Sequence, residues 1–328
     1  MRKRKIAILG CRGIPARYGG FERIAEELST RLVRKGHVVY VACEKNLQEL
    51  VKRSLKKGTY KGVMLIYFPI IESIRIFSEV FYDFLSLIWA SFADVDVIYL
   101  LGYSAAPAIL IPRVFRKIVL VNVNGLEWKR RKFNPLIRSI LRVMEKIVVK
   151  LANIVVDSKV MEWYYLKNYG IKAYYVPNCL SVPPAYAPET LDSIFNLKPN
   201  DYYLVVARLE PENNIDMIVK AFMESPTKKK LVIVGPLKRT SFVRKLVGLA
   251  LKDEKRRIIF VGGIYNKRLL TTLRKYCFAY IHAHEVGGTN PSLIEAMACQ
   301  NLILALNTPF NKEIADTSGL YFRKNVKS

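Results

Sequence analysis

The chain has 328 residues, 51% hydrophobic and 24% charged, a length that suits two globular domains with separate cores. Lys and Arg total 53 against 27 Asp and Glu, and this formal net charge of +26 favours polyanionic partners: phosphorylated substrates, an anionic membrane surface or nucleic acid. Five dispersed cysteines argue against a disulfide framework and indicate reduced, cytoplasmic thiols, while the apolar windows are too short for a membrane-spanning helix.

Apolar runs rich in β-forming residues alternate with helical patterns through the first half of the chain. The opening MRKRKIAILG indicates a first strand rather than a secretory signal, and Gly20–Lys35 is predicted to be a helix. Strands are predicted at Lys5–Cys11, His37–Cys43, Val63–Pro69, Asp96–Gly102, Lys117–Gly125, Asn153–Ser158 and Ala173–Asn178. Such alternation is typical of a parallel sheet covered by helices on both faces.

A second alternating series follows the proline-rich stretch Leu180–Ser193, so we expect domains at residues 1–180 and 181–328. Its strands are predicted at Tyr202–Leu209, Lys230–Pro236, Arg257–Gly263, Phe278–His284 and Leu302–Leu306. Two doubly wound α/β domains in tandem would place their ligand sites at strand ends on either side of a cleft.

The stretch HAHEVGGTNPSLIEAMA, residues 282–298, contains the first candidate site. If a strand ends at His284, then Gly287-Gly288 forms a turn and Pro291 begins a helix capped by Asn290 or Thr289. A glycine turn before a helix N-terminus is suited to binding a pyrophosphate, and Glu295 would reach a ribose or sugar hydroxyl. A strand–turn–helix corner without a ligand is the alternative.

Two stretches of the first half are further candidates. Gly19-Gly20 opens a helix after a strand and loop, but the pattern is not G-x-G-x-x-G, so no nicotinamide cofactor is expected. Glu22 is either a first-turn residue favoured by the helix dipole or a ligand for hydroxyl groups. Glu127 is a candidate for orienting a substrate hydroxyl and Trp128 for stacking on a sugar; a salt bridge of this loop with the basic Lys129–Lys132 is the alternative.

Asp94-Val95-Asp96 spells a D-x-D motif but precedes its predicted strand, which is the wrong edge of the sheet for a metal site. The two histidines beside Glu285 form no zinc site that the nearby sequence completes. We therefore expect neither a metal nor another cofactor.

Four segments in order carry a family resemblance: GCRGIPARYGGFERIAEELSTRLVRKGHVVYV, VNVNGLEWKRRKFN, VARLEPENNIDMIVKAF and GGTNPSLIEAMACQNLILA. Together they resemble retaining GT-B glycosyltransferases of family 4, in the branch that contains rhamnosyltransferase-like enzymes. The resemblance implies two Rossmann-like domains, the first binding an acceptor and the second a nucleoside-diphosphate sugar. It also implies sugar transfer with retention at the anomeric carbon.

The resemblance assigns roles to particular residues. Arg208 matches an arginine that holds the donor diphosphate, while Asn213 occupies the position of the family's lysine. Glu295 matches the second of two family glutamates, expected on the nucleotide ribose. The first glutamate falls at Gly287, and Glu285 is the candidate replacement. Helix N–H groups, Arg12 or Arg17 are candidates to offset the missing lysine.

These considerations give two sets of expected site residues. The catalytic candidates are Glu127, Asn124 (where an acid is common in the family), Arg208 and Glu285. The expected substrate-binding residues are Gly19, Gly20, Arg17, Arg208, Asn213, His284, Gly287, Gly288, Thr289, Asn290 and Glu295. His284 is expected in the sugar pocket, since it lies nearer the turn than His282.

The expected partners are the sugar donor, a saccharide or lipid-linked acceptor in surface-glycan synthesis, and an anionic membrane surface. Basic runs at Arg2–Lys5, Lys52–Lys57 and Lys129–Lys132, with the aromatic-rich Phe68–Ala93, indicate a flank facing the membrane at its cytoplasmic side. Solvated surface and a thermophilic composition are the alternatives.

Rhamnose is the sugar that the branch suggests. A nucleotide-sugar epimerase and a non-catalytic sugar-nucleotide-binding subunit remain as rival functions. Nucleic acid is not expected, because no RNP, KH or helix-turn-helix signature is present.

Overall fold

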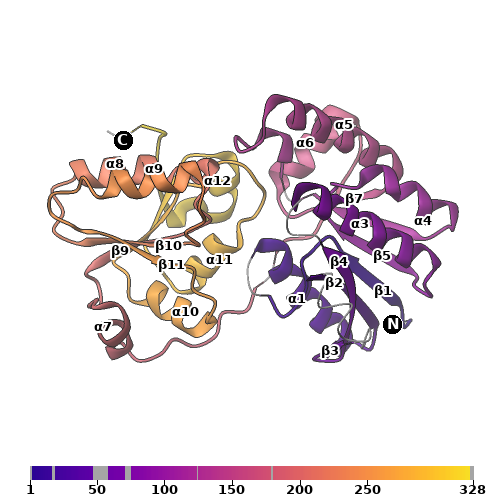
Figure 1. Cartoon of the computed structure of the whole chain (residues 1–328), viewed down its shortest axis with the longest axis horizontal. Coiled ribbons are helices and arrows are strands. Elements are labelled where there is room, and N and C mark those ends of the chain that lie inside the picture. Colours follow the sequence, from indigo (N-terminus) through magenta and orange to yellow (C-terminus); the bar gives the residue numbers. More distant parts are fainter. Residues whose placement is uncertain are drawn as a thin grey trace. The chain divides into compact units, whose positions relative to one another are not determined.

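A computed structural model describes residues 2–16, 19–46, 58–70, 75–123, 125–178 and 180–325, so Arg17, Asn124 and Lys52–Lys57 lie outside the described residues. The chain forms two compact units (Figure 1). The first unit comprises Met1–Trp128 and Pro135–Cys179, and the second comprises Lys129–Asn134 and Leu180–Ser328. Although Lys129–Asn134 is flanked on both sides by the first unit, it packs as part of the second.

The first unit contains a sheet in the order β3-β4-β2-β1-β5-β6-β7-β8, parallel except for β3 against β4. Its strands are β1 (Lys5–Leu9), β2 (Val38–Asn46), β3 (Gly58–Tyr60), β4 (Val63–Ile70), β5 (Val97–Leu101), β6 (Ile118–Asn122), β7 (Asn153–Val156) and β8 (Tyr174–Tyr175). Ile8 of β1 is opposite Tyr99 of β5, and both pack with Ile24 of the first helix.

Helices connect these strands, as the parallel order requires. They are α1 (Gly20–Arg34), α3 (Arg75–Phe92), α4 (Leu110–Val114), α5 (Pro135–Leu151) and α6 (Lys159–Tyr169), with short 3₁₀ turns η2 (Ala106–Ile109) and η3 (Glu127–Lys129). Helix α6 begins where the Ser158 hydroxyl accepts a hydrogen bond from the Met161 N–H, and it ends at Gly170 with φ 68°.

The second unit contains a fully parallel sheet in the order β11-β10-β9-β12-β13-β14. Its strands are β9 (Tyr202–Val206), β10 (Lys230–Val234), β11 (Ile258–Gly262), β12 (Ala279–His282), β13 (Ile303–Leu306) and β14 (Gly319–Phe322). The strand order reverses between β9 and β12, the position at which doubly wound sheets bind ligands beyond their carboxyl ends.

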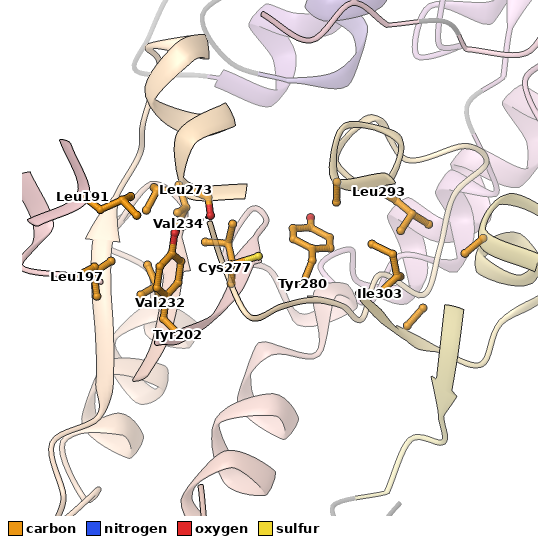
Figure 2. Packing of buried hydrophobic residues seen from close by; sticks show 14 residues of the cluster. Leu191, Leu197, Tyr202, Val232, Val234, Leu273, Cys277, Tyr280, Leu293 and Ile303 are labelled. Atoms are coloured by element: carbon orange, nitrogen blue, oxygen red, sulfur yellow. Dashed lines mark hydrogen bonds between the residues drawn. The ribbon is translucent and has the colours of Figure 1, made fainter. Parts of the chain in front are cut away.

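Alternating side chains on β9 and β10 give the second unit a core on each face of its sheet. Leu204 and Val232 face a cluster built with α7 (Glu189–Phe195), α10 (Lys267–Lys275) and α11 (Pro291–Ala298), which Figure 2 shows around Tyr280. The next residue of β9, Val205, faces the opposite cluster. That cluster is built with α8 (Ile215–Glu224) and α9 (Ser241–Ala250). The remaining elements are η4 (Pro211–Asn213), α12 (Pro309–Ala315) and η5 (Asp316–Ser318).

The doubly wound α/β fold is confirmed, and most differences from the prediction concern strand ends. Strand β12 ends at His282, so His284 lies in the following loop, and β6 ends at Asn122 rather than Gly125. The strand predicted over residues 173–178 is reduced to two residues. The short antiparallel β3 was not predicted, since three residues with a glycine give no period-two pattern.

Candidate functional site

The candidate site lies at the carboxyl ends of β9 and β12. Strand β9 leads into residues 207–214 and β12 into residues 283–290. The Ser292 hydroxyl donates to the carbonyl of Val206 at 3.1 Å, and the Asn214 carboxamide donates to the carbonyl of Ala283 at 2.9 Å. The first hydrogen bond joins α11 to the end of β9, and the second joins the two loops to each other where the strand order reverses.

Helix α11 begins as the sequence predicts. Asn290 is its N-cap and accepts a hydrogen bond from the Ser292 N–H at 2.9 Å, and Pro291 occupies the first helical position. Gly287 has φ 150°, a conformation that favours glycine, and the turn residues Gly287, Gly288 and Thr289 are buried. Since Pro291 has no N–H and the cap takes that of Ser292, a bound anion would contact the turn at residues 287–290.

Glu295 is held in place from within the second unit. Arg274, which is 2% exposed, pairs with the Glu295 carboxylate at 2.6 Å and donates to the Ser292 hydroxyl at 3.0 Å. The Tyr280 hydroxyl lies 2.7 Å from the same Ser292 oxygen, and burial raises the pKa of Tyr280 to about 12. Arg274 was not predicted as a site residue, because its spacing from Glu295 gives no local signal in the sequence.

The Asn213 side chain is hydrogen-bonded to both loops. Its carboxamide N–H donates to the carbonyl of Arg208 at 2.6 Å, and its oxygen accepts from His284 Nδ1, also at 2.6 Å. Burial, with His282 and the cations Arg130 and Arg208 adding to it, holds the pKa of His284 well below its usual range. The His284 imidazole is therefore neutral at pH 7, with its proton on Nδ1 and an acceptor at Nε2.

His282, the last residue of β12, is buried. Its ring stacks against Tyr280 at a centroid separation of 6.1 Å, and burial lowers the pKa of His282 to about 4. Within the described part of the chain, its Nε2 atom has no hydrogen-bond partner. His282 is thus a neutral core residue.

Consecutive basic residues of the segment Lys129–Asn134 pair with carboxylates of the two loops. Arg130 pairs with Glu212 at 3.7 Å, and Lys132 with Glu210 at 3.6 Å. Arg131 pairs with Glu285. Arg130 is 8% exposed, so the expectation that Lys129–Lys132 forms a membrane-facing flank is wrong at this residue. The nearest of these acidic partners, Glu210, lies 78 positions from Lys132 in sequence, a separation at which sequence periodicity gives no signal.

The pKa values of three carboxylates of the site are shifted in different directions. Burial opposes ionisation of Glu285, but the hydrogen bonds and charges of Lys324 (2.8 Å) and Arg131 lower its pKa. Burial likewise opposes ionisation of Glu210, and the nearby Arg208 and Lys132 still lower the pKa of this carboxyl. For Glu212 burial dominates and the Glu210 charge adds to it, so the pKa of Glu212 is raised.

In the first unit, Gly19 and Gly20 open α1 as predicted. Gly19 has φ 113°, and a Cβ there would lie 2.0 Å from a Glu22 carboxylate oxygen. Glu22 accepts a hydrogen bond from the Arg12 N–H at 3.1 Å, so this first-turn carboxylate fixes the loop before the helix.

The loop after β6 contains Glu127 and Trp128. The Trp128 indole N–H donates to Glu145 at 2.8 Å, and the Arg142 guanidinium lies 5.0 Å over the indole ring. Glu145 is fully buried and also accepts from Tyr164 and Tyr169. Trp128 is thus tied to α5 and α6, whereas the predicted sugar stacking would need its ring face. Glu127 is half-buried in η3.

The D-x-D motif lies at the amino edge of β5, as its position before the strand predicts. Asp94 pairs with Lys5, and Asp96 accepts from the Lys5 backbone N–H at 2.8 Å. Both aspartates therefore join the start of β1 to the start of β5, at the opposite end of the sheet from the loops that follow the strands.

Two doubly wound units, the second with a glycine turn and a helix N-terminus at its reversal point, define the GT-B class of fold. Solved structures share it. A sucrose-phosphate synthase from Thermosynechococcus elongatus superposes with a TM-score of 0.79 at 17% identity, covering 99% of this chain and 87% of that chain. The Anabaena protein HepE in complex with UDP-glucose gives 0.71 at 14% identity, covering 98% and 85%. A glycosyltransferase from Rickettsia africae gives 0.68 at 17%, covering 98% and 84%.

Family models match both parts of the chain. The model described as "Glycosyl transferases group 1" matches residues 189–322, so the second unit carries a glycosyltransferase domain. The model described as "Domain of unknown function (DUF1972)" matches residues 3–177, and the chain belongs to this family. No curated protein matches the chain.

Proposed function

We propose that the protein is a retaining glycosyltransferase that takes a sugar from a nucleoside-diphosphate donor bound in the second unit. The observation that carries the proposal is the corner at the reversal point of the sheet, where the α11 N-terminus is hydrogen-bonded to the end of β9 and Arg208 lies in the loop that follows β9. The UDP-glucose bound in HepE supports a sugar nucleotide as the ligand class.

Each residue of the corner has a chemical task in this proposal. Arg208 and the turn at residues 287–290 neutralise the diphosphate as it leaves, which stabilises the charge that develops in the transition state. Glu295, oriented by Arg274, accepts hydrogen bonds from the nucleotide ribose. Neutral His284 offers Nε2 to a sugar hydroxyl, because its Nδ1 is engaged by Asn213.

The acceptor belongs to the first unit in this proposal, with the domains functionally divided at residues 180 and 181. Glu127 and Asn124 would steer the acceptor hydroxyl, and the Gly19-Gly20 turn would contact the substrate. Glu285 would act beside the sugar in place of the glutamate absent at Gly287. Because several cations surround the corner, no metal ion is needed to neutralise the diphosphate. Family resemblance suggests rhamnose or another hexose as the sugar.

A lipid-linked or saccharide acceptor at the cytoplasmic face of a membrane fits the surface of α5. Leu136, Ile140 and Val143 form a stripe at helical spacing and are 70%, 46% and 52% exposed. The exposed charges beside them, Arg142, Lys146 and Lys150, are all basic, whereas the acid of this helix, Glu145, is fully buried. An apolar stripe with a basic rim favours an anionic lipid surface. Within the described residues, no helix has the length and hydropathy to cross a bilayer.

Thermal stabilisation by nucleotides tests the donor site. UDP-, GDP- and dTDP-sugars are added in turn to the wild type and to Glu295→Ala. We expect one nucleotide class to raise the melting temperature of the wild type and to lose this effect in the variant. Equal shifts in both proteins would remove Glu295 from the site.

A non-catalytic sugar-nucleotide-binding subunit is the second candidate, favoured by Asn213 and Gly287 where the family has a lysine and a glutamate. Binding without turnover on extracted lipid acceptors would establish it. Release of an isomerised sugar nucleotide in the absence of acceptor would instead establish an epimerase.

A further inference from the structure

The two loops of the candidate site, residues 207–214 and 283–290, are paired with cations from another part of the chain. Arg208 lies 3.7 Å from Glu210, and Lys132 of the segment Lys129–Asn134 lies 3.6 Å from the same carboxylate oxygen, Oε2. Two cations from distant parts of the chain therefore share one counter-ion. Asn213, at the position where the resemblance expects a lysine, contributes no charge.

We propose that Lys132 supplies the missing cation, so that Lys132 and Arg208 together bind the donor diphosphate, and that Glu210 is the counter-ion which the diphosphate displaces. The proposal rests on the proposed function, because it concerns the diphosphate of the same donor. It assigns a ligand-binding role to one residue, Lys132, of the segment Lys129–Asn134 in the second unit.

The geometry of the ion pairs distinguishes Lys132 from its neighbours. The side chains of Lys132 and Arg208 are 29% and 37% exposed, so a ligand can reach them, whereas Arg130 is buried and faces the buried Glu212. Arg131 is engaged by Glu285 and by the Asn214 carboxamide at 2.9 Å. Of Arg130, Arg131 and Lys132, only Lys132 is therefore both accessible and close enough to Glu210 to bind a ligand together with Arg208.

The contacts with Glu210 are loose enough to be exchanged. Charge-assisted hydrogen bonds between N–H donors and anionic oxygens measure about 2.7–2.9 Å, and both separations here exceed that range. Glu210 Oε2 is buried and accepts no hydrogen bond within the described residues. Phosphate oxygens would thus replace two ion pairs by two direct hydrogen bonds.

The charge balance of the cluster matches the ligand. Arg130, Arg131, Lys132, Arg208 and Lys324 face three carboxylates, which are those of Glu210, Glu212 and Glu285. With all three carboxylates ionised, these ion pairs carry a net charge of +2. A diphosphate bridged between a nucleoside and a sugar carries about two negative charges at neutral pH, since each esterified phosphate keeps one acidic oxygen.

Calorimetric titration with nucleotides tests the role of Lys132. UDP, GDP and dTDP, each beside its monophosphate, are titrated into the wild type, Lys132→Ala, Lys132→Arg and the control Lys129→Ala, which changes an exposed lysine of the same segment. For the nucleotide that binds, we expect Lys132→Ala to weaken diphosphate binding roughly 10-fold or more and monophosphate binding far less. Lys132→Arg should retain most of the affinity.

Glu210→Gln provides a readout that a purely structural role would not give. Removal of the competing anion should tighten diphosphate binding several-fold even if it lowers the melting temperature, and this variant decides the matter should Lys132→Ala fail to fold. Unchanged diphosphate affinity in Lys132→Ala, with a binding wild type, would overturn the inference and leave the proposed function intact. A wild type that binds none of these nucleotides would overturn both.

Discussion

The ion pair between Arg274 and Glu295 allows a quantitative test of how the second unit positions its ribose-binding carboxylate. Arg274→Met removes the guanidinium that pairs with the Glu295 carboxylate, whose side chain is 15% exposed. Removal of one member of a buried ion pair typically costs about 3–5 kcal/mol, and we expect the lower end because Glu295 retains contact with water. Glu295→Leu strands Arg274, which is more deeply buried, and should cost at least as much.

The double variant should recover about 2 kcal/mol or more relative to the sum of the single variants, because neither charge is then left alone. Native-state hydrogen exchange across β12 and α11 measures this coupling locally. All three tryptophans, Trp89, Trp128 and Trp163, lie in the first unit, so their fluorescence during urea unfolding serves as an internal control that should not change. Lys275→Met, an exposed neighbour on α10, is the matched variant.

Strictly additive single-variant effects, with a coupling below about 0.5 kcal/mol, would refute the reasoning. In that case the 2.6 Å contact would not hold the carboxylate in place.

Three further predictions follow from buried groups and from the surface of α5. The pKa of His282 is about 4 in the folded protein against about 6.5 in the unfolded chain. The unfolded chain therefore binds a proton more readily below pH 6.5, and the free energy of unfolding should fall by about 3 kcal/mol as the pH is lowered from 6.5 to 4. Urea unfolding at pH 7 and pH 5 should show this fall in the wild type and a smaller one in His282→Phe. Trp128→Phe removes a donor from the buried Glu145 and should lower the free energy of unfolding by about 1–3 kcal/mol in urea titrations; an unchanged midpoint would contradict this account. The double variant Leu136→Ser/Val143→Ser should weaken cosedimentation with anionic vesicles, and binding of the wild type should fall as the fraction of anionic lipid is lowered. Wild-type binding that ignores lipid charge would exclude the proposed membrane surface.

Much of the second unit could be predicted because its signals are local. The N-cap at Asn290 and Pro291 defines the helix start within two residues, and an apolar run defines β12. Arg208, Asn213 and His284 meet because β9 and β12 are neighbours, as the doubly wound order requires once the strands are assigned. Family resemblance placed the same residues together by a separate route.

What the sequence could not predict depends on pairing between distant side chains. The docking of Lys129–Asn134 onto the second unit follows from its ion pairs with Glu210, Glu212 and Glu285, which no period or spacing reveals. The sequence gives no sign that Trp128 is engaged, because its hydrogen-bond partner Glu145 lies among basic residues of α5 and would be expected at the surface. In the structure Glu145 is fully buried and accepts from the Trp128 indole N–H. From sequence alone, a run of charged residues such as Lys129–Lys132 predicts a solvated surface. The burial of Arg130 depends on tertiary packing, which the sequence pattern does not reveal.

The central claim is that the turn before α11 and Arg208 bind the diphosphate of the donor. A crystal structure of the protein with the nucleoside diphosphate chosen by the binding panel tests it most directly. We predict phosphate oxygens within hydrogen-bonding distance of the Arg208 guanidinium and of backbone N–H groups at residues 287–290. A diphosphate bound at another place, with Arg208 still paired to Glu210 and the turn unoccupied, would contradict the account.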